Sequence, residues 1–231
     1  MRLRTKLAIP VGLVGATTVV AVVLATGPAS AGSKASPVGH GTITHVAGPN
    51  SLPVLYDQFN NADGDGLVSQ VFEPELGAYD SATADDFVVP AGQKWVIKQL
   101  VAGGVQYGTT KPLSVTMYFY NDNGGGLPGT LAKSATATEG DSGGTLTMKV
   151  KGVKLGSGHW WVAVVANMPS NGFNNRWFFG TRTVQSNSPG AFINNSDAWG
   201  TGCSAWGQAN VCAPVLGSGV DYLFTLYGSI V

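Results

Sequence analysis

The segment Asn61-Ala62-Asp63-Gly64-Asp65-Gly66 places side-chain oxygens at alternate positions beside glycines. This spacing matches the front half of a calcium-binding loop, in which alternate oxygen ligands converge on the cation. Phe72 occupies the position where an EF-hand has its bidentate Glu, so we expect no EF-hand. The interpretation that we favour is a solvated Asp-Gly turn. The alternative is a structural calcium site, for which the candidate ligands are Asp57, Asn61, Asp63, Asp65, Asp85 and Asp86.

A second candidate site is the segment 171–206, in which aromatic, amide and guanidinium side chains gather. Such sets bind sugars, because pyranose C–H faces stack on aromatic rings and the hydroxyls bond to Asn, Asp and Arg. The alternative is that Trp177 and Phe179 belong to a core face and that Trp206 packs on a disulfide. The ligand-binding residues that we predict are Arg176, Trp177, Arg182, Asn194, Asn195, Asp197, Trp199 and Trp206.

Groups suited to catalysis are scarce in the chain. A glycosidase generally needs two carboxylates on opposite sides of one bond. Only three Glu are present, and Asp85 and Asp86 are adjacent on an expected strand, which points them to opposite faces. No Gly-x-Ser-x-Gly elbow leads from a strand into a helix, and we interpret Gly156-Ser157-Gly158-His159 as a turn before a strand. We expect His159 to close a hairpin or bond the backbone rather than to act as a base.

The first 31 residues have the pattern of a secretory signal. Basic residues precede an apolar stretch over residues 7–24, and Ala29-Ser30-Ala31 supplies a cleavage site. We therefore predict a signal peptide over residues 1–31 and a secreted, extracellular protein. A membrane anchor is the less favoured alternative, because small residues follow the apolar stretch directly. Residues 32–53 are rich in Gly, Ser, Thr and Pro, and we expect them to form a flexible linker.

The composition is that of a sparsely charged, turn-rich globular protein. Of the 231 residues, 11% are charged, and 13 basic residues balance 13 acidic ones. No charge field therefore exists to hold nucleic acid or an anionic membrane surface. A hydrophobic content of 44% supports a sizeable core, which excludes global disorder.

The two cysteines of the chain are Cys203 and Cys212. An even number of cysteines in an exported chain predicts a disulfide bond between them. A metal pair is a poor alternative, because His40, His45 and His159 are scattered and supply no further ligand at zinc spacing.

From residue 54 onward, short β-prone runs alternate with Gly, Asn and Pro clusters, which is typical of a β-sandwich. Apolar residues alternate with Ser, Thr and Tyr over 113–120, which predicts a strand with one buried and one solvent-exposed face. The run 160–166 is almost continuously apolar, which predicts a central strand covered on both sides. The Gly clusters at 121–126 and 140–144 are suited to tight reversals. The expected strands are 54–59, 68–72, 86–89, 95–101, 113–120, 130–138, 145–150, 159–166, 176–180 and 222–227.

Several short motifs recur together in one group of proteins. They are Leu55-Tyr56-Asp57-Gln58, the segment 84–93 (ADDFVVPAGQ), Tyr118-Phe119-Tyr120 with the following Leu127-Pro128-Gly129, His159-Trp160-Trp161-Val162, Thr181-Arg182 and Gly200-Thr201-Gly202-Cys203. Over most of residues 32–231 the chain resembles a largely uncharacterised β-sandwich module of secreted bacterial proteins. The resemblance implies a jelly-roll architecture and export, and it transfers no catalytic residue.

Together these observations predict an all-β fold over residues 54–231, an antiparallel two-sheet β-sandwich of jelly-roll type. We expect a secreted, non-catalytic protein that binds glycans or cell-surface polymers, with calcium as a candidate structural ion. One alternative is an extracellular polysaccharide hydrolase, and another is a structural or self-associating envelope protein. We expect no nucleic-acid partner, and no membrane association once the signal peptide is cleaved.

Overall fold

The structure is a computed structural model, and it describes residues 35–45, 52–138, 140–217 and 220–231. The predicted signal peptide, residues 1–31, lies outside the described residues. Strands account for 57% and helices for 7%, and the strands form two antiparallel sheets, so the predicted all-β sandwich is confirmed. The jelly-roll topology stays a prediction. Within the described ranges, no helix combines the length and the apolar character needed to cross a membrane.

The smaller sheet has five strands in the order β1-β3-β11-β14, and β6 pairs with β11. All of these pairs are antiparallel. Glycine is required at position 39 of β1, because a Cβ there would lie 2.5 Å from the ring of Phe178 on β11. The strands are β1 (Val38–His40), β3 (Ala62–Val68), β6 (Gly104–Tyr107), β11 (Arg176–Arg182) and β14 (Asp221–Tyr222).

Three segments of this sheet, β1, residues 62–66 of β3, and β6, have no strand predicted from the sequence, and the first two pair with each other. β1 lies inside the segment 32–53, where we expect a flexible linker, yet Val38 is buried and pairs with Leu67. Residues 62–66 belong to β3 rather than to a turn or a calcium loop. Both corrections have one cause, which is that β3 pairs with distant partners on both sides and so becomes a central strand.

The larger sheet has ten strands, ordered β13-β12-β5-β10-β7-β8 along its main path, with β15, β2, β4 and β9 attached to it. One short pair, β4 with β10, is parallel. Its strands are β2 (Val54–Asp57), β4 (Gln70–Val71), β5 (Ala82–Ala102), β7 (Ser114–Asp122), β8 (Pro128–Ala137), β9 (Gly140–Ser142), β10 (Thr145–Asn167), β12 (Ala191–Ile193), β13 (Gly207–Gln208) and β15 (Phe224–Ile230). The short helices are η1 (Pro74–Tyr79), α1 (Ala209–Cys212) and η2 (Pro214–Leu216).

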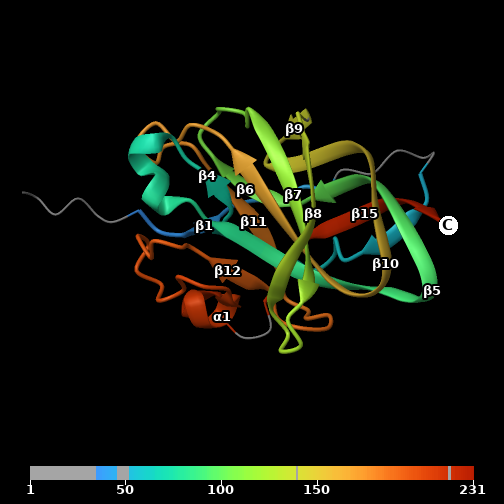
Figure 1. The fold of residues 1–231 in the computed structure, drawn as a ribbon. Coiled ribbons are helices and arrows are strands. Elements are labelled where there is room, and N and C mark those ends of the chain that lie inside the picture. The colour runs from blue at the N-terminus through green and yellow to red at the C-terminus, as the bar shows by residue number, and fades with distance from the viewer. Residues whose placement is uncertain (1–34, 46–51, 139, 218–219) are drawn as a thin grey trace, which may run out of the picture. The chain divides into compact units, whose positions relative to one another are not determined.

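Strands β5 and β10 are each longer than the sequence predicts, and Figure 1 shows them as long curved ribbons that run together. Each unites two of the expected strands. Pro90 is tolerated because residues 90–93 have no partner in β10. In β10 the register shifts between Gly156 and Gly158, so the expected turn before His159 is instead an irregularity within a continuous strand.

The sequence pattern correctly predicts which faces are buried. On β7, Val115, Met117 and Phe119 are fully buried, as the alternation over 113–120 predicts. On β10, the run 161–166 is buried on both faces. One face joins the main core between the sheets. The other face, which includes Trp161 and Val165, forms a second cluster with Ala84 and Ala191 from β5 and β12.

Candidate functional site

The acidic residues of β3 and β2 are engaged with separate partners. Asp63 Oδ1 accepts hydrogen bonds from the Asp65 N–H at 3.0 Å and from the Thr181 hydroxyl at 2.5 Å. Asp65 Oδ1 lies 2.5 Å from His40 Nδ1. Asp57 Oδ1 accepts a hydrogen bond from the Thr225 hydroxyl at 2.6 Å. Each of these carboxylates therefore joins two strands of a sheet.

The described residues hold no group of three or more His, Cys, Asp or Glu side chains that could bind a metal ion. The five aspartates of the predicted calcium set therefore do not converge. Asp85 and Asp86 have different partners, as expected for adjacent strand residues. Asp85 Oδ2 accepts hydrogen bonds from Gln58 Nε2 and from the Tyr222 N–H, both at 2.6 Å.

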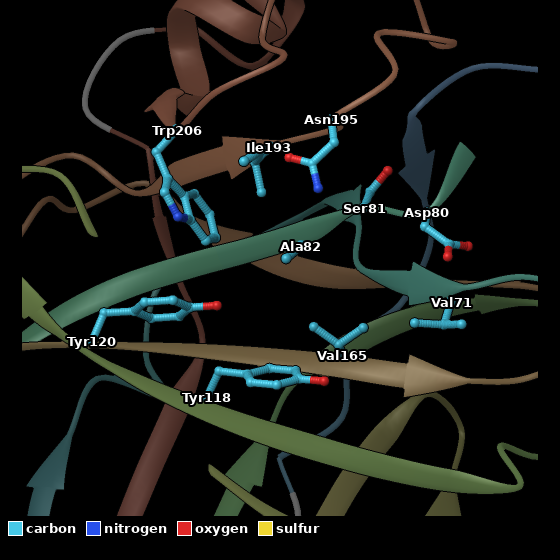
Figure 2. Close-up of a pocket in the computed structure, with 10 residues that line it drawn as sticks. All are labelled: Val71, Asp80, Ser81, Ala82, Tyr118, Tyr120, Val165, Ile193, Asn195 and Trp206. Carbon is cyan, nitrogen blue, oxygen red and sulfur yellow. The ribbon is translucent and has the colours of Figure 1, made fainter. Parts of the chain in front are cut away.

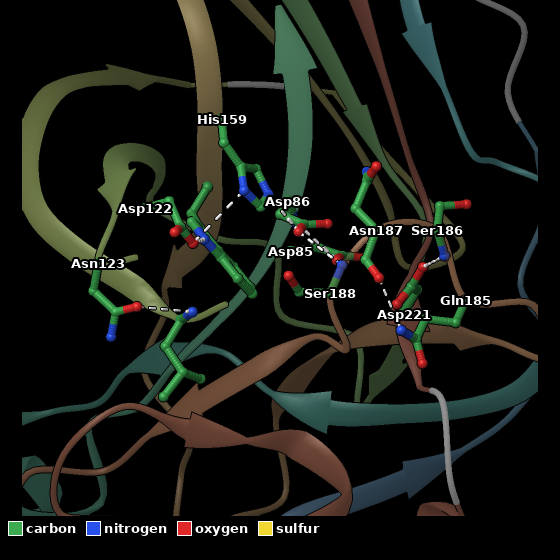
Figure 3. Close-up of polar contacts among 12 residues, drawn as sticks. Asp85, Asp86, Asp122, Asn123, His159, Gln185, Ser186, Asn187, Ser188 and Asp221 are labelled. Carbon is green, nitrogen blue, oxygen red and sulfur yellow. Dashed lines mark hydrogen bonds and ion pairs between the residues drawn. The ribbon is translucent and has the colours of Figure 1, made fainter. Parts of the chain in front are cut away.

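Asp85, Asp86 and Asp221 form a cluster of fully buried carboxyl groups (Figure 3). Burial raises the pKa of each of them, that of Asp85 well above its ordinary value and that of Asp221 to about 7. Arg182 Nη1 is 4.0 Å from Asp221 Oδ2. Asp86 Oδ1 and Asp221 Oδ1 are buried without a hydrogen-bond partner. This cluster ties β5 to the segment that precedes β12, because Asp86 accepts the Ser188 N–H and Asp221 accepts the Ser186 N–H.

His159 lies between two carboxylates rather than against the backbone, which corrects the sequence expectation. Its Nε2 is 2.6 Å from Asp86 Oδ2, and its Nδ1 is 3.7 Å from Asp122 Oδ1 (Figure 3). In a serine hydrolase the second ring nitrogen of such a histidine faces a hydroxyl nucleophile. Here that nitrogen faces Asp122, so the arrangement links β5, β10 and the end of β7 and does not form a catalytic triad.

Four of the eight predicted ligand-binding side chains are buried: Trp177, Arg182, Asn194 and Trp199. The Trp177 indole N–H donates to the Gly144 carbonyl at 2.6 Å, and the Trp199 indole N–H donates to Tyr79 O and Ser81 Oγ. These side chains stabilise the fold, which corrects the prediction for them. The core alternative for Trp177 and Phe179 is the one observed.

The other predicted ligand-binding residues are divided between separate places. Arg176 lies 5.2 Å from the ring centroids of both Tyr107 and Phe178. Asp197 Oδ1 accepts the Gly202 N–H within its own loop. Asn195 and Trp206 line one pocket. The structure thus brings two of the eight together at a surface opening, among neighbours that the sequence did not single out.

This opening, which we call the tyrosine pocket, has a volume of about 240 Å³ (Figure 2). It lies on the face of the larger sheet opposite the main core, because Tyr118 and Tyr120 alternate along β7 with the buried Met117 and Phe119. Its lining consists of Val71, Asp80, Ser81, Ala82, Tyr118, Tyr120, Val165, Ile193, Asn195 and Trp206.

Three aromatic rings form one side of the tyrosine pocket. The Tyr118 and Tyr120 ring centroids are 6.5 Å apart, and the Tyr120 and Trp206 centroids are 5.5 Å apart at an interplanar angle of 75°. Burial raises the pKa of Tyr120 to about 12, so its hydroxyl remains protonated at neutral pH. Figure 2 shows both phenol hydroxyls pointing toward the part of the pocket where Ser81 and Asp80 lie.

The opposite side of the pocket is polar. Asp80 follows η1, and its Oδ1 accepts the Phe72 N–H at 2.8 Å. Ser81 Oγ donates to the Tyr79 carbonyl at 2.7 Å. Asn195 is exposed, and Figure 2 shows its amide directed into the pocket near Ser81. The tyrosine pocket therefore combines an aromatic side with a side that offers carboxylate, hydroxyl and amide groups.

No protein-family model, curated protein or solved structure matches this chain. A functional conclusion therefore depends on the chemistry of the tyrosine pocket. The alternation over 113–120 places Tyr118 and Tyr120 on the solvent-exposed face of their strand. Two tyrosines on this face are the feature of the sequence that indicates this site. Asp80 and Ser81 have no comparable signal, because their positions depend on the pairing of Ser81 with Gln70 and on the hydrogen bond from the Phe72 N–H to Asp80.

Proposed function

We propose that the protein binds glycans, without catalysis, through the tyrosine pocket. The observation that carries the proposal is the gathering of Tyr118, Tyr120 and Trp206 around one opening, from segments about 90 residues apart. Aromatic faces stack on the C–H faces of sugar rings, while hydroxyl, amide and carboxylate groups bond to sugar hydroxyls.

The size of the pocket suits one sugar unit of a longer chain. Pockets that enclose a drug-sized ligand measure roughly 300–1,000 Å³, and the tyrosine pocket, at about 240 Å³, is smaller. A polymer would therefore place one residue against the rings and continue along the surface. This is consistent with an extracellular polysaccharide as the ligand, given the secretory signal that the sequence predicts.

The lining favours binding over hydrolysis. A glycosidase uses two carboxylates that flank the scissile bond. Among the ten residues that line the tyrosine pocket, Asp80 is the single carboxylate. The pocket thus holds the groups for recognition and lacks the second carboxylate that hydrolysis would need.

Isothermal titration with soluble oligosaccharides and pull-down on insoluble polysaccharides test this proposal. We expect the full chain to bind at least one neutral or amino polysaccharide. Trp206→Ala and Tyr118→Ala should each weaken that binding about tenfold, which corresponds to the loss of about 1.4 kcal/mol of ring contact.

Trp160→Ala is the matched control, because Trp160 is half-buried on the same sheet but packs against the main core rather than the tyrosine pocket. It should leave the affinity unchanged. If the wild type binds no glycan, or if the Tyr118→Ala, Trp206→Ala double variant binds as well as the wild type, the proposal is wrong.

A further inference from the structure

The ten residues that line the tyrosine pocket have an unbalanced charge. Asp80 is a carboxylate, and no Lys, Arg or His is among them. A single negative charge in a partly enclosed site attracts a cationic group and repels an anionic one, more strongly than in bulk water because the local dielectric is lower. The lining therefore opposes uronic acids and sulfated sugars and favours a ligand with a positive group.

The Asp80 carboxylate is held in place, and one of its oxygens remains available. Its Oδ1 accepts the Phe72 N–H at 2.8 Å. Its backbone is held as well, because its N–H donates to the Gly77 carbonyl and its own carbonyl accepts Asn194 Nδ2. Within the described ranges, Oδ2 has no hydrogen-bond donor. A ligand cation could thus bind Oδ2 without first ordering this side chain.

Partial burial strengthens the case for a cationic ligand. Asp80 is half-buried, and burial raises its pKa above the ordinary value. A carboxylate that has lost part of its hydration gains more from an ammonium partner than a fully solvated one does.

The positions of Asp80 and the rings determine the kind of cation that fits. In Figure 2, Asp80 lies at the end of the pocket away from Trp206, with Ser81 and Asn195 between them. A ligand that contacts both ends needs an apolar ring face and, some distance from it, an ammonium group. An amino sugar has this form, because its pyranose ring can stack while its amine extends from the ring edge. A lysine side chain has an ammonium group but no ring face.

We propose that the tyrosine pocket selects glycans that carry free amino groups and that Asp80 recognises the ammonium group. This inference rests on the proposed glycan binding and adds the class of sugar. Neutral N-acetylated sugars would lack the contact between an ammonium group and the carboxylate. Acidic sugars would be repelled by the carboxylate.

The test compares three hexasaccharides with the full chain by isothermal titration at mildly acidic pH, at which the sugar amines are protonated: β-linked glucosamine, β-linked N-acetylglucosamine and galacturonic acid. We expect the glucosamine hexamer to bind about tenfold more tightly than the acetylated one, a typical effect of one charge-assisted hydrogen bond. The galacturonate should bind most weakly. The preference for glucosamine should decrease as the salt concentration rises.

Asp80→Asn tests the residue itself, because an amide oxygen can still accept the Phe72 N–H. This variant should lose the preference, so that it binds the glucosamine hexamer and the N-acetylglucosamine hexamer with about equal affinity. Glu75→Gln is the control, because Glu75 is an exposed carboxylate on the neighbouring η1 that does not line the pocket. It should keep the wild-type preference.

The outcomes separate this inference from the proposed function. If the wild type binds the glucosamine and N-acetylglucosamine hexamers equally, the amino-sugar selectivity is overturned while glycan binding stands. The same holds if Asp80→Asn still prefers the glucosamine hexamer. If no glycan binds, both proposals fail. If a lysine-rich peptide binds in an Asp80-dependent manner and no glycan does, the pocket recognises protein and both are likewise overturned.

Discussion

Asp221 is fully buried, and its environment disfavours its charge. Its Oδ2 accepts the Ser186 N–H, while Oδ1 is buried without a partner. Burial, with the charge of Asp86 adding to it, raises the pKa of Asp221 to about 7, against an ordinary value of 3.8. Between these two pH values the folded state binds a proton at Asp221 that the unfolded state does not bind. The free energy of unfolding therefore decreases as the pH rises from about 4 through 7.

We predict that the protein melts at a higher temperature at pH 5 than at pH 8, and that Asp221→Asn reduces this difference. The effect of the variant should be on the order of 5 °C, since one unit of pKa shift corresponds to about 1.4 kcal/mol and 1 kcal/mol to about 2–4 °C. Thermal melts followed by circular dichroism across this pH range measure it. Glu75→Gln, which removes an exposed carboxylate, should leave the pH dependence as it is; an unchanged slope in Asp221→Asn would contradict the prediction.

The predicted Cys203–Cys212 disulfide is present, and it encloses the segment that carries Trp206. A Cβ added at Gly207 would lie 2.9 Å from both sulfur atoms, so the disulfide packs directly against the backbone that follows Trp206. β13 then pairs with β12, which pairs with β5. These contacts hold the Trp206 ring beside Tyr120.

We predict that the Cys203→Ala, Cys212→Ala double variant loses stability and glycan affinity together. Loss of a disulfide between cysteines nine positions apart should cost about 2–3 kcal/mol in the chain-entropy model, and the released Trp206 ring would stack less well. Met148→Ala is a control for destabilisation alone, because Met148 is fully buried in the main core. It should melt at a lower temperature yet bind as the wild type does below that temperature. Wild-type affinity in the double variant would show that the disulfide does not position Trp206.

At the scale of the whole molecule, the folded unit begins before the first strand that the sequence predicts. It extends over Ala35–Val231. β1 pairs with β3, Arg176 Nη1 donates to the Ser36 carbonyl at 2.7 Å, and the Thr145 hydroxyl donates to the Thr44 carbonyl at 2.5 Å. Residues 35–44 therefore contribute to the sandwich.

We predict that a chain beginning at Thr42 melts at a lower temperature than one beginning at Ala35. The shorter chain lacks β1, so it leaves an edge of β3 unpaired and exposes the ring of Phe178 beside Gly39. Burial of a Val side chain alone contributes about 1.5 kcal/mol, and we expect a decrease on the order of 5 °C. Calorimetry of the two chains measures this difference in melting temperature. Equal melting temperatures would mean that β1 adds nothing to the stability of the sheet.

Structural features that depend on only a few neighbouring residues could be predicted from the sequence. The alternation at 113–120 and the apolar run 160–166 indicate which faces are buried, because side chains on a strand alternate between its two sides whatever the strand pairs with. Gly124 and Gly126 adopt positive φ between β7 and β8, as glycine permits and other residues resist. The disulfide follows from two cysteines in a chain expected to be exported.

What only the tertiary structure decided is which segments meet. Trp199 and Trp206 are seven positions apart in one aromatic-rich segment, yet Trp199 is buried against Tyr79 and Trp206 lines a pocket with Tyr120. The segment 61–66 fits a calcium loop by its spacing, but residues 62–66 lie in a strand, because β1 and β11 pair with it. The turn-rich β character of the chain is thus a local property of its residues. The tyrosine pocket depends on strand pairings between residues far apart in the chain, and no local pattern specifies these pairings.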